Sequence, residues 1–157
     1  MHFLRRHPYG APLSEMSFAA GKNAVLHSEQ LPYGGKIYLQ EGITMPFINV
    51  KTNAQVSKEQ EVELKAALGK AITAIPGKSE GWLMIGIEPQ QAMYFKGTDD
   101  PCAMVSVSIY GSASSSAYDN LTGQIDGILG DILGIDKSRI YTAYFPTSDW
   151  GWNGGNF

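Results

Sequence analysis

The pattern of apolar and polar positions divides the chain into two parts that meet at Met45. Before that residue, glycine, proline and serine are frequent, and neither a helical nor a strand period is sustained. Directly after it, Phe47–Thr52 is a β-branched and aromatic run with the partial alternation of a strand. We therefore expect residues 1–44 to be a poorly ordered N-terminal extension and residues 45–157 to be the folded domain.

Two later segments have the spacing of amphipathic helices. In Ser57–Ile75, Ser57 and Gln60 match a capping box, in which each side chain bonds the other residue's backbone N–H, and Pro76-Gly77 ends the pattern. Ser115–Gly134 also carries apolar residues three and four positions apart, and glycine ends it.

The second of these helices contains interior glycines, each of which costs about 1 kcal/mol relative to alanine. They are Gly123, Gly127 and Gly130. Their spacing predicts close packing along one side of the helix, against the sheet.

The strand-like runs alternate with the two helices. These runs are Phe47–Thr52, Gly81–Pro89, Cys102–Gly111 and Arg139–Phe145. The order is strand–helix–strand twice over, which predicts an α+β fold: a duplicated βαβ unit forming one four-stranded mixed sheet with both helices on one face. Because the strands are apolar at most positions, we expect an oligomer to cover the other face.

Composition narrows the chemistry. The net charge of −3 excludes nucleic acid and an anionic membrane surface as partners, and no apolar run reaches the roughly 18 residues of a membrane span. The three histidines all precede Met45, and Cys102 is the single cysteine. Residues 46–157 therefore offer no Ser-His or Cys-His nucleophile and no usual zinc site. An enzymatic base there must be a carboxylate, a lysine, a tyrosine or a terminal amine.

Five short motifs occur in a fixed order: MPFINVKTN, GKSEGW, DDPCAMVSVSIYG, RIYTAYF and GWNGGNF. Together they resemble the macrophage migration inhibitory factor family of the tautomerase superfamily, over residues 45–157. The resemblance implies a homotrimer with one active site at each subunit boundary. It also implies a catalytic proline at the mature N-terminus, and no metal or organic cofactor.

The resemblance assigns roles to individual residues. Pro46 is the catalytic base and acid, and the substrate-binding residues are Lys78 for the carboxylate, Tyr110 through its backbone N–H, Tyr141 from the neighbouring subunit, and Trp152 and Phe157 at the rim. A prolyl amine suits this role because an α-amino group has a pKa near 7.7–8.0, which burial beside a cation lowers further. When the family resemblance is set aside, the alternative is that Pro46 only starts a strand and that Lys78 is an ordinary solvated lysine in a loop.

Two departures from the family's pattern affect the expected activity. Ala143 replaces an asparagine that hydrogen-bonds the substrate, which puts affinity for phenolic substrates in doubt. Where the family has Cys-x-x-Cys, this chain has Cys102-Ala103-Met104-Val105. A single thiol does not support thiol–disulfide chemistry, which is therefore not expected.

The segment before Met45 decides whether the proline can act. While it is attached, the Pro46 nitrogen is an amide whose lone pair is delocalised, and it is not a base. Either the extension is removed, or translation starts at Met45, or the chain is not this enzyme.

The resulting hypothesis is a trimeric keto–enol tautomerase acting on a small keto acid such as phenylpyruvate, or on a dopachrome-like molecule. One alternative is a cytokine-like binding protein, with a receptor at the cell surface and Pro46 blocked or idle. Another is a trimeric scaffold with vestigial pockets. Proline and glycine interrupt the start of the chain where a signal peptide needs an apolar stretch. We expect a cytoplasmic protein, with release from the cell by an unconventional route as the alternative.

Overall fold

The computed structural model describes residues 45–156, and their strands and helices follow the expected order. The main elements are β1 (Pro46–Thr52), α1 (Lys58–Ala71), β2 (Met84–Glu88), β3 (Ala103–Tyr110), α2 (Ser115–Leu133) and β4 (Ile140–Thr147). Short 3₁₀ turns, η2 (Ile72–Ala74), η3 (Glu80–Trp82) and η4 (Lys137–Arg139), lie between them, and the strands β5 (Gly151–Trp152) and β6 (Gly155–Asn156) follow. The expected N-terminal extension, residues 1–44, and Phe157 lie outside the described residues.

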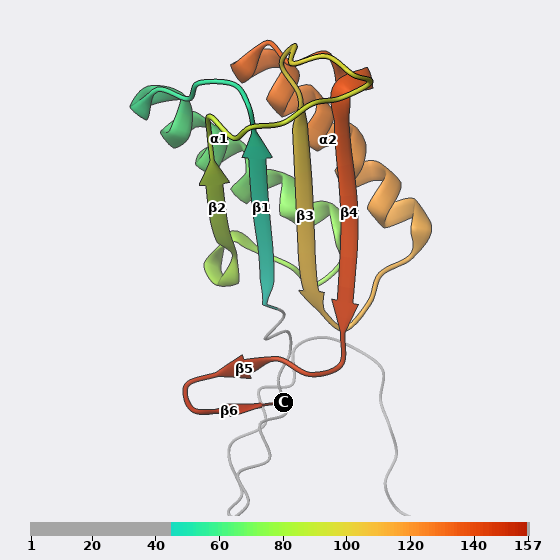
Figure 1. The fold of residues 1–157 in the computed structure, drawn as a ribbon. Helices are drawn as coiled ribbons and strands as arrows, with labels where there is room; N and C mark the ends of the chain where they lie inside the picture. Colours follow the sequence, from blue (N-terminus) through green and yellow to red (C-terminus); the bar gives the residue numbers. More distant parts are fainter. Residues whose placement is uncertain (1–44, 157) are drawn as a thin grey trace, which may run out of the picture. The chain divides into compact units, whose positions relative to one another are not determined.

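The four main strands form one mixed sheet in the order β2-β1-β3-β4. Within each βαβ half the strands are parallel, whereas β1 and β3 pair antiparallel. Both helices cover one face of this sheet (Figure 1). The predicted α+β architecture is confirmed.

Strand register places two sets of residues at opposite ends of the sheet. At one end Pro46 pairs with Ile109, and Ile109 pairs with Pro146. At the other end Lys51 pairs with Met104, which pairs with Tyr141. In Figure 1, β1 begins at the lower edge of the sheet and β4 begins at the upper edge.

The core lies between the sheet and the helices. Alternate residues of the central strands face it and are fully buried, among them Ile48, Val50, Val105, Val107 and Ile109. The opposite face is more polar than the apolar runs suggested, because the intervening positions hold Asn49, Lys51, Ser106 and Ser108. It also carries the exposed side chains of Met84, Tyr141 and Phe145.

The predicted capping box begins α1. The hydroxyl of Ser57 accepts from the Gln60 N–H at 3.2 Å, and the Gln60 side chain accepts from the Ser57 N–H at 3.0 Å. The Gln60 amide also donates to the carbonyl of Ile132 at 2.8 Å, which ties the start of α1 to the end of α2. The helix ends at Ala71, before the predicted Ile75, and η2 continues the turn.

The prediction that the α2 glycines pack closely was wrong. A Cβ at Gly123 or Gly127 would have nothing within 4 Å, and one at Gly130 would meet only a carbonyl at 3.5 Å. The reason is angular: Leu121 and Ile125 face the core, and a residue two positions later is rotated by about 200° around the helix. Within residues 45–156, no helix is long and apolar enough to cross a membrane.

Gly127→Ala is therefore expected to stabilise the domain by about 0.5–1 kcal/mol, since alanine removes the entropic cost of glycine without a clash. Urea denaturation of the two proteins measures the difference. Gly134→Ala is the matched control with the opposite sign, because Gly134 caps α2 at φ +68°, where a side chain is strained. A loss of stability in Gly127→Ala would show that another surface packs on this face of α2.

Candidate active site

Pro46 is the first residue of β1 and is buried at the end of the sheet. The residue before it, Met45, is only 5% exposed, and its carbonyl accepts a hydrogen bond from the Tyr110 N–H at 3.2 Å. In the 157-residue chain the Pro46 nitrogen is thus part of a peptide bond that is held against β3. As an amide nitrogen it does not accept a proton at neutral pH.

Lys78 lies at the same end of the sheet, in the turn after η2. Its backbone N–H donates to Ile75, and the turn passes through Gly77 at φ +78°. The residue is only 7% exposed, and its Nζ donates to the carbonyl of Tyr110 at 2.6 Å. Burial lowers the pKa of this ammonium group below its ordinary value.

No carboxylate balances the Lys78 charge among the described residues. The four ion pairs that join residues within 45–156 are all formed by other cations. A buried ammonium group is costly unless an anion accompanies it. The arrangement is therefore suited to receive the carboxylate of a ligand.

The backbone of Tyr110 connects Lys78 to the start of β1. Its N–H bonds the Met45 carbonyl, while its own carbonyl accepts from Lys78. Both bonds use main-chain atoms, and the side chain of Tyr110 is half-buried beside them. The structure thus brings together three of the residues that the sequence indicated.

Trp152 comes from the hairpin of β5 and β6 and packs against Trp82. The two rings meet edge to face, with centroids 5.4 Å apart and planes at 89°. Trp82 belongs to η3, four residues after Lys78, and both indoles are partly exposed. Our sequence reasoning did not assign Trp82, although an aromatic residue shortly after a lysine in a Gly-rich turn was a usable signal.

Tyr141 lies at the opposite end of the sheet from Pro46. It is in register with Lys51, five residues along β1 from Pro46, which corresponds to about 17 Å at the rise of a β-strand. Its side chain is 62% exposed and contacts Phe95. Within one copy of the chain, Tyr141 and Pro46 do not share a site. Phe157, the other expected rim residue, is outside the described range.

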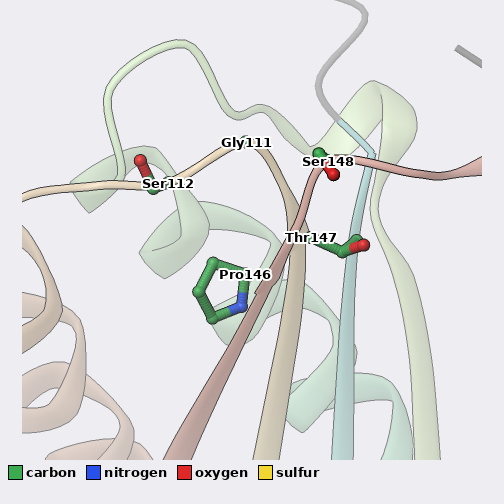
Figure 2. A pocket seen from close by; sticks show the side chains of 5 residues that line it. All are labelled: Gly111, Ser112, Pro146, Thr147 and Ser148. Atoms are coloured by element: carbon green, nitrogen blue, oxygen red, sulfur yellow. The ribbon is translucent and has the colours of Figure 1, made fainter.

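An open depression of about 280 Å³ lies at the Pro46 end, over β3 and β4. Figure 2 shows its lining residues, Gly111, Ser112, Pro146, Thr147 and Ser148. The Gly111 N–H donates to the Thr147 carbonyl at 2.8 Å, which joins the two strand ends. Neither Pro46 nor Lys78 lines it, so this depression is a neighbour of the candidate site and not its centre.

A second group with a shifted pKa is unrelated to this site. Asp126 lines an open groove on the outer side of α2, and burial raises the pKa of its carboxyl although Lys137 opposes the shift. One carboxyl oxygen is buried without a hydrogen-bond partner in the described part of the chain. Within residues 45–156, no three His, Cys, Asp or Glu side chains are grouped to hold a metal ion.

Comparison with known proteins gave a consistent result. The family model described as macrophage migration inhibitory factor (MIF) matches residues 45–157. The chain is 31% identical over 115 residues to macrophage migration inhibitory factor of Mus musculus, covering 72% of this chain and 99% of that protein. A homolog from Brugia malayi is 29% identical over the same share of each chain.

Solved structures resemble the fold. The crystal structure of Leishmania major MIF2 superposes with a TM-score of 0.68 and 30% identity, covering 72% of this chain and 97% of that one. A macrophage migration inhibitory factor homologue from Prochlorococcus marinus gives a TM-score of 0.64 and 26% identity, covering 71% and 98%.

Proposed function

Because the chain belongs to the macrophage migration inhibitory factor family, we propose that it is a keto–enol tautomerase for small aryl α-keto acids. The proposal requires that Pro46 become the first residue, so that its nitrogen is a secondary amine. Tautomerase activity and cytokine-like roles both occur in this family.

The observation that carries this proposal is the buried Lys78 ammonium, which has no carboxylate partner among the described residues. Lys78 donates to the carbonyl of Tyr110, and the N–H of Tyr110 donates to the carbonyl of Met45, the residue directly before Pro46. An α-keto acid offers a carboxylate for the lysine and an acidic C–H next to its carbonyl for a base. In a chain that begins at Pro46, the same end of the sheet therefore supplies both groups that the reaction needs.

The reaction is a proton transfer with no net change in charge. The Pro46 amine removes a proton from the carbon next to the keto group, and the electron pair moves to form the enolate. The resulting ammonium then protonates the enolate oxygen, which gives the enol; the reverse path gives the ketone. The neighbouring Lys78 charge and burial both lower the pKa of the Pro46 amine, which keeps it unprotonated near neutral pH.

The aromatic residues near Lys78 favour an aryl side chain on the substrate. Trp82 and Trp152 present two partly exposed rings at a right angle. We propose that they form a wall against which an aryl ring packs. Phe157 is assigned to the same rim from the sequence.

The site is proposed to be completed by a second copy in a homotrimer. Tyr141 and Phe145 are exposed on the sheet face opposite α1 and α2, as their pairing with Met104 and Ser108 shows. Since Tyr141 is about 17 Å of strand from Pro46 in its own chain, it is available to contact a substrate held by a neighbouring copy.

A binding role is the second candidate for the unprocessed chain. In the 157-residue chain the Pro46 nitrogen is an amide, and the Met45 carbonyl is bonded to Tyr110. In that form we propose a cytokine-like protein that acts through its surface, with a receptor as partner and no chemistry at Pro46.

Phenylpyruvate tests the enzyme proposal directly. A chain that begins at Pro46, verified by intact mass, is expected to accelerate ketonisation of phenylpyruvate enol, followed by the loss of enol absorbance. The ethyl ester, which lacks the carboxylate, and pyruvate, which lacks the ring, are expected to be poorer substrates. If a correctly assembled chain with free Pro46 leaves the phenylpyruvate rate at its uncatalysed value, the binding role is favoured.

A further inference from the structure

The loop between β2 and β3 is held firmly at the end of the sheet opposite Pro46. It crosses the upper edge of the sheet in Figure 1, beside the start of β4. The Asn53 amide donates to the carbonyls of Asp99 and Asp100 at 2.9 and 3.1 Å, and its oxygen accepts from the Cys102 N–H at 2.8 Å. The loop backbone is therefore held by Asn53, the residue that follows β1.

Arg139, the last residue of η4, holds the same loop from just before β4. Its guanidinium donates to the carbonyls of Pro101 at 3.0 Å and Asp100 at 2.9 Å. The carbon at the centre of the guanidinium lies 5.3 Å from the ring centroid of Phe95. Because the Arg139 side chain is only 16% exposed and bonds the loop, we assign it to holding the loop and not to binding a ligand.

Phe95 lies in this loop and closes a turn within it. Its N–H and carbonyl bond the carbonyl and N–H of Thr98 at 2.9 and 3.1 Å, closing a tight turn. Both central residues have positive φ, Lys96 at 51° and Gly97 at 78°, as in a type I′ turn. A lysine rarely adopts this conformation, and here its Nζ lies 5.4 Å from the Phe95 ring centroid.

The fixed Phe95 ring contacts Tyr141 directly. The two rings meet at 73° with centroids 4.9 Å apart, an edge-to-face geometry. Tyr141 is 62% exposed, and within residues 45–156 no hydrogen bond of its side chain accompanies this ring contact. Two residues before Tyr141 in sequence, Arg139 at the end of η4 holds the loop that carries Phe95.

We propose that Phe95 is a positioning residue, which sets the ring orientation of Tyr141 so that the tyrosine is pre-organised for the substrate of a neighbouring copy. The role rests on the proposed function, since it gives Tyr141 a substrate to meet. Phe95 itself touches no substrate. Pre-organisation reduces the rotamer entropy lost on binding, so its removal weakens substrate binding and leaves the proton transfer at Pro46 intact.

Phe95→Leu in the chain that begins at Pro46 is the main test. An aromatic pair contributes roughly 0.5–1.5 kcal/mol, so we expect KM for phenylpyruvate to rise about 2- to 12-fold with kcat nearly unchanged. Phe95→Tyr keeps the ring and is expected to restore the wild-type KM. Tyr94→Leu is the matched control, because Tyr94 directly precedes Phe95 in the loop and is 75% exposed.

A spectroscopic measurement separates this proposal from the proposed function. With 3-fluorotyrosine placed at position 141, we expect the wild-type chain to give a narrow, shifted ¹⁹F resonance and Phe95→Leu to move it toward the value of free fluorotyrosine. This readout does not depend on turnover. An inactive wild-type chain with the shifted resonance would overturn the proposed function alone.

Two results would overturn the positioning role. One is an unchanged ¹⁹F resonance and KM in Phe95→Leu. The other is a KM effect of Phe95→Leu that persists in full when Tyr141→Ala is already present, since a residue that acts through the Tyr141 ring loses most of its effect once that ring is removed.

Discussion

A chain that begins at Pro46 is expected to convert phenylpyruvate about 10²- to 10⁴-fold faster than the 157-residue chain, the usual contribution of a positioned acid–base group. The difference arises at one atom. In the long chain the Pro46 nitrogen shares its lone pair with the Met45 carbonyl, and that carbonyl is bonded to Tyr110. Translation from Met45 followed by removal of the methionine supplies the short chain, and intact mass verifies it.

Acetylation of the short chain gives the matched control for this comparison. It restores an amide at Pro46 without restoring the preceding residues, so activity is expected to fall to the level of the long chain. Pro46→Gly keeps a terminal amine but loses the ring, and an intermediate activity is expected. Equal activity in the short, acetylated and long chains would show that the proline nitrogen is not the base.

Removing the Lys78 ammonium is expected to lower kcat/KM for phenylpyruvate about 30-fold or more, the equivalent of roughly 2 kcal/mol for a buried charge pair that loses one partner. Lys78→Met keeps the length of the side chain. For the ethyl ester of phenylpyruvate the loss is expected to be small, because the ester offers no carboxylate. The matched control is Lys65→Met, since Lys65 forms an exposed ion pair with Glu80.

The same variant is expected to be more stable than the wild type at neutral pH. Burial lowers the pKa of Lys78, so the folded state binds this proton less tightly than the unfolded state does. The destabilisation is fully present below the folded pKa and disappears as the pH rises toward the ordinary value of 10.5. Urea denaturation at neutral and alkaline pH measures the change, and a less stable Lys78→Met at neutral pH would contradict it.

Local signals were sufficient for most of the fold. The capping box at Ser57 and Gln60 placed the start of α1 because two reciprocal hydrogen bonds need only residues close in sequence. Gly134 likewise marked the end of α2, where the backbone turns to φ +68°. The start of β2 was predicted too early. The expected strand began at Gly81, whereas β2 begins at Met84 because Glu80–Trp82 form η3.

Long-range features were harder to predict. The spacing of Gly123 and Gly127 resembles a packing stripe, yet only the angular position of the core residues shows that this side faces outward. Asn153-Gly154 is a strong hairpin signal that we did not use, and both residues have positive φ between β5 and β6. Contact between Trp82 and Trp152, residues 70 positions apart in sequence, follows from that hairpin.

The candidate site divides in the same way. Pro46 and Lys78 were named through a family resemblance, and the structure supplies what joins them, the backbone of Tyr110. Neither hydrogen bond was predicted, because both use main-chain atoms of Tyr110 and do not depend on the identity of its side chain. Strand register gives the position of Tyr141 at the other end of the sheet.

Placing Pro46 and Tyr141 at opposite ends of the sheet has a genetic consequence if copies complete one another's sites. Each chain then contributes to two sites, so a defect at one end of a chain silences one site and leaves the other end able to serve its neighbour. Two defects on one chain silence two sites. A chain defective at Pro46 and another defective at Tyr141 can together assemble one intact site, so such alleles complement each other.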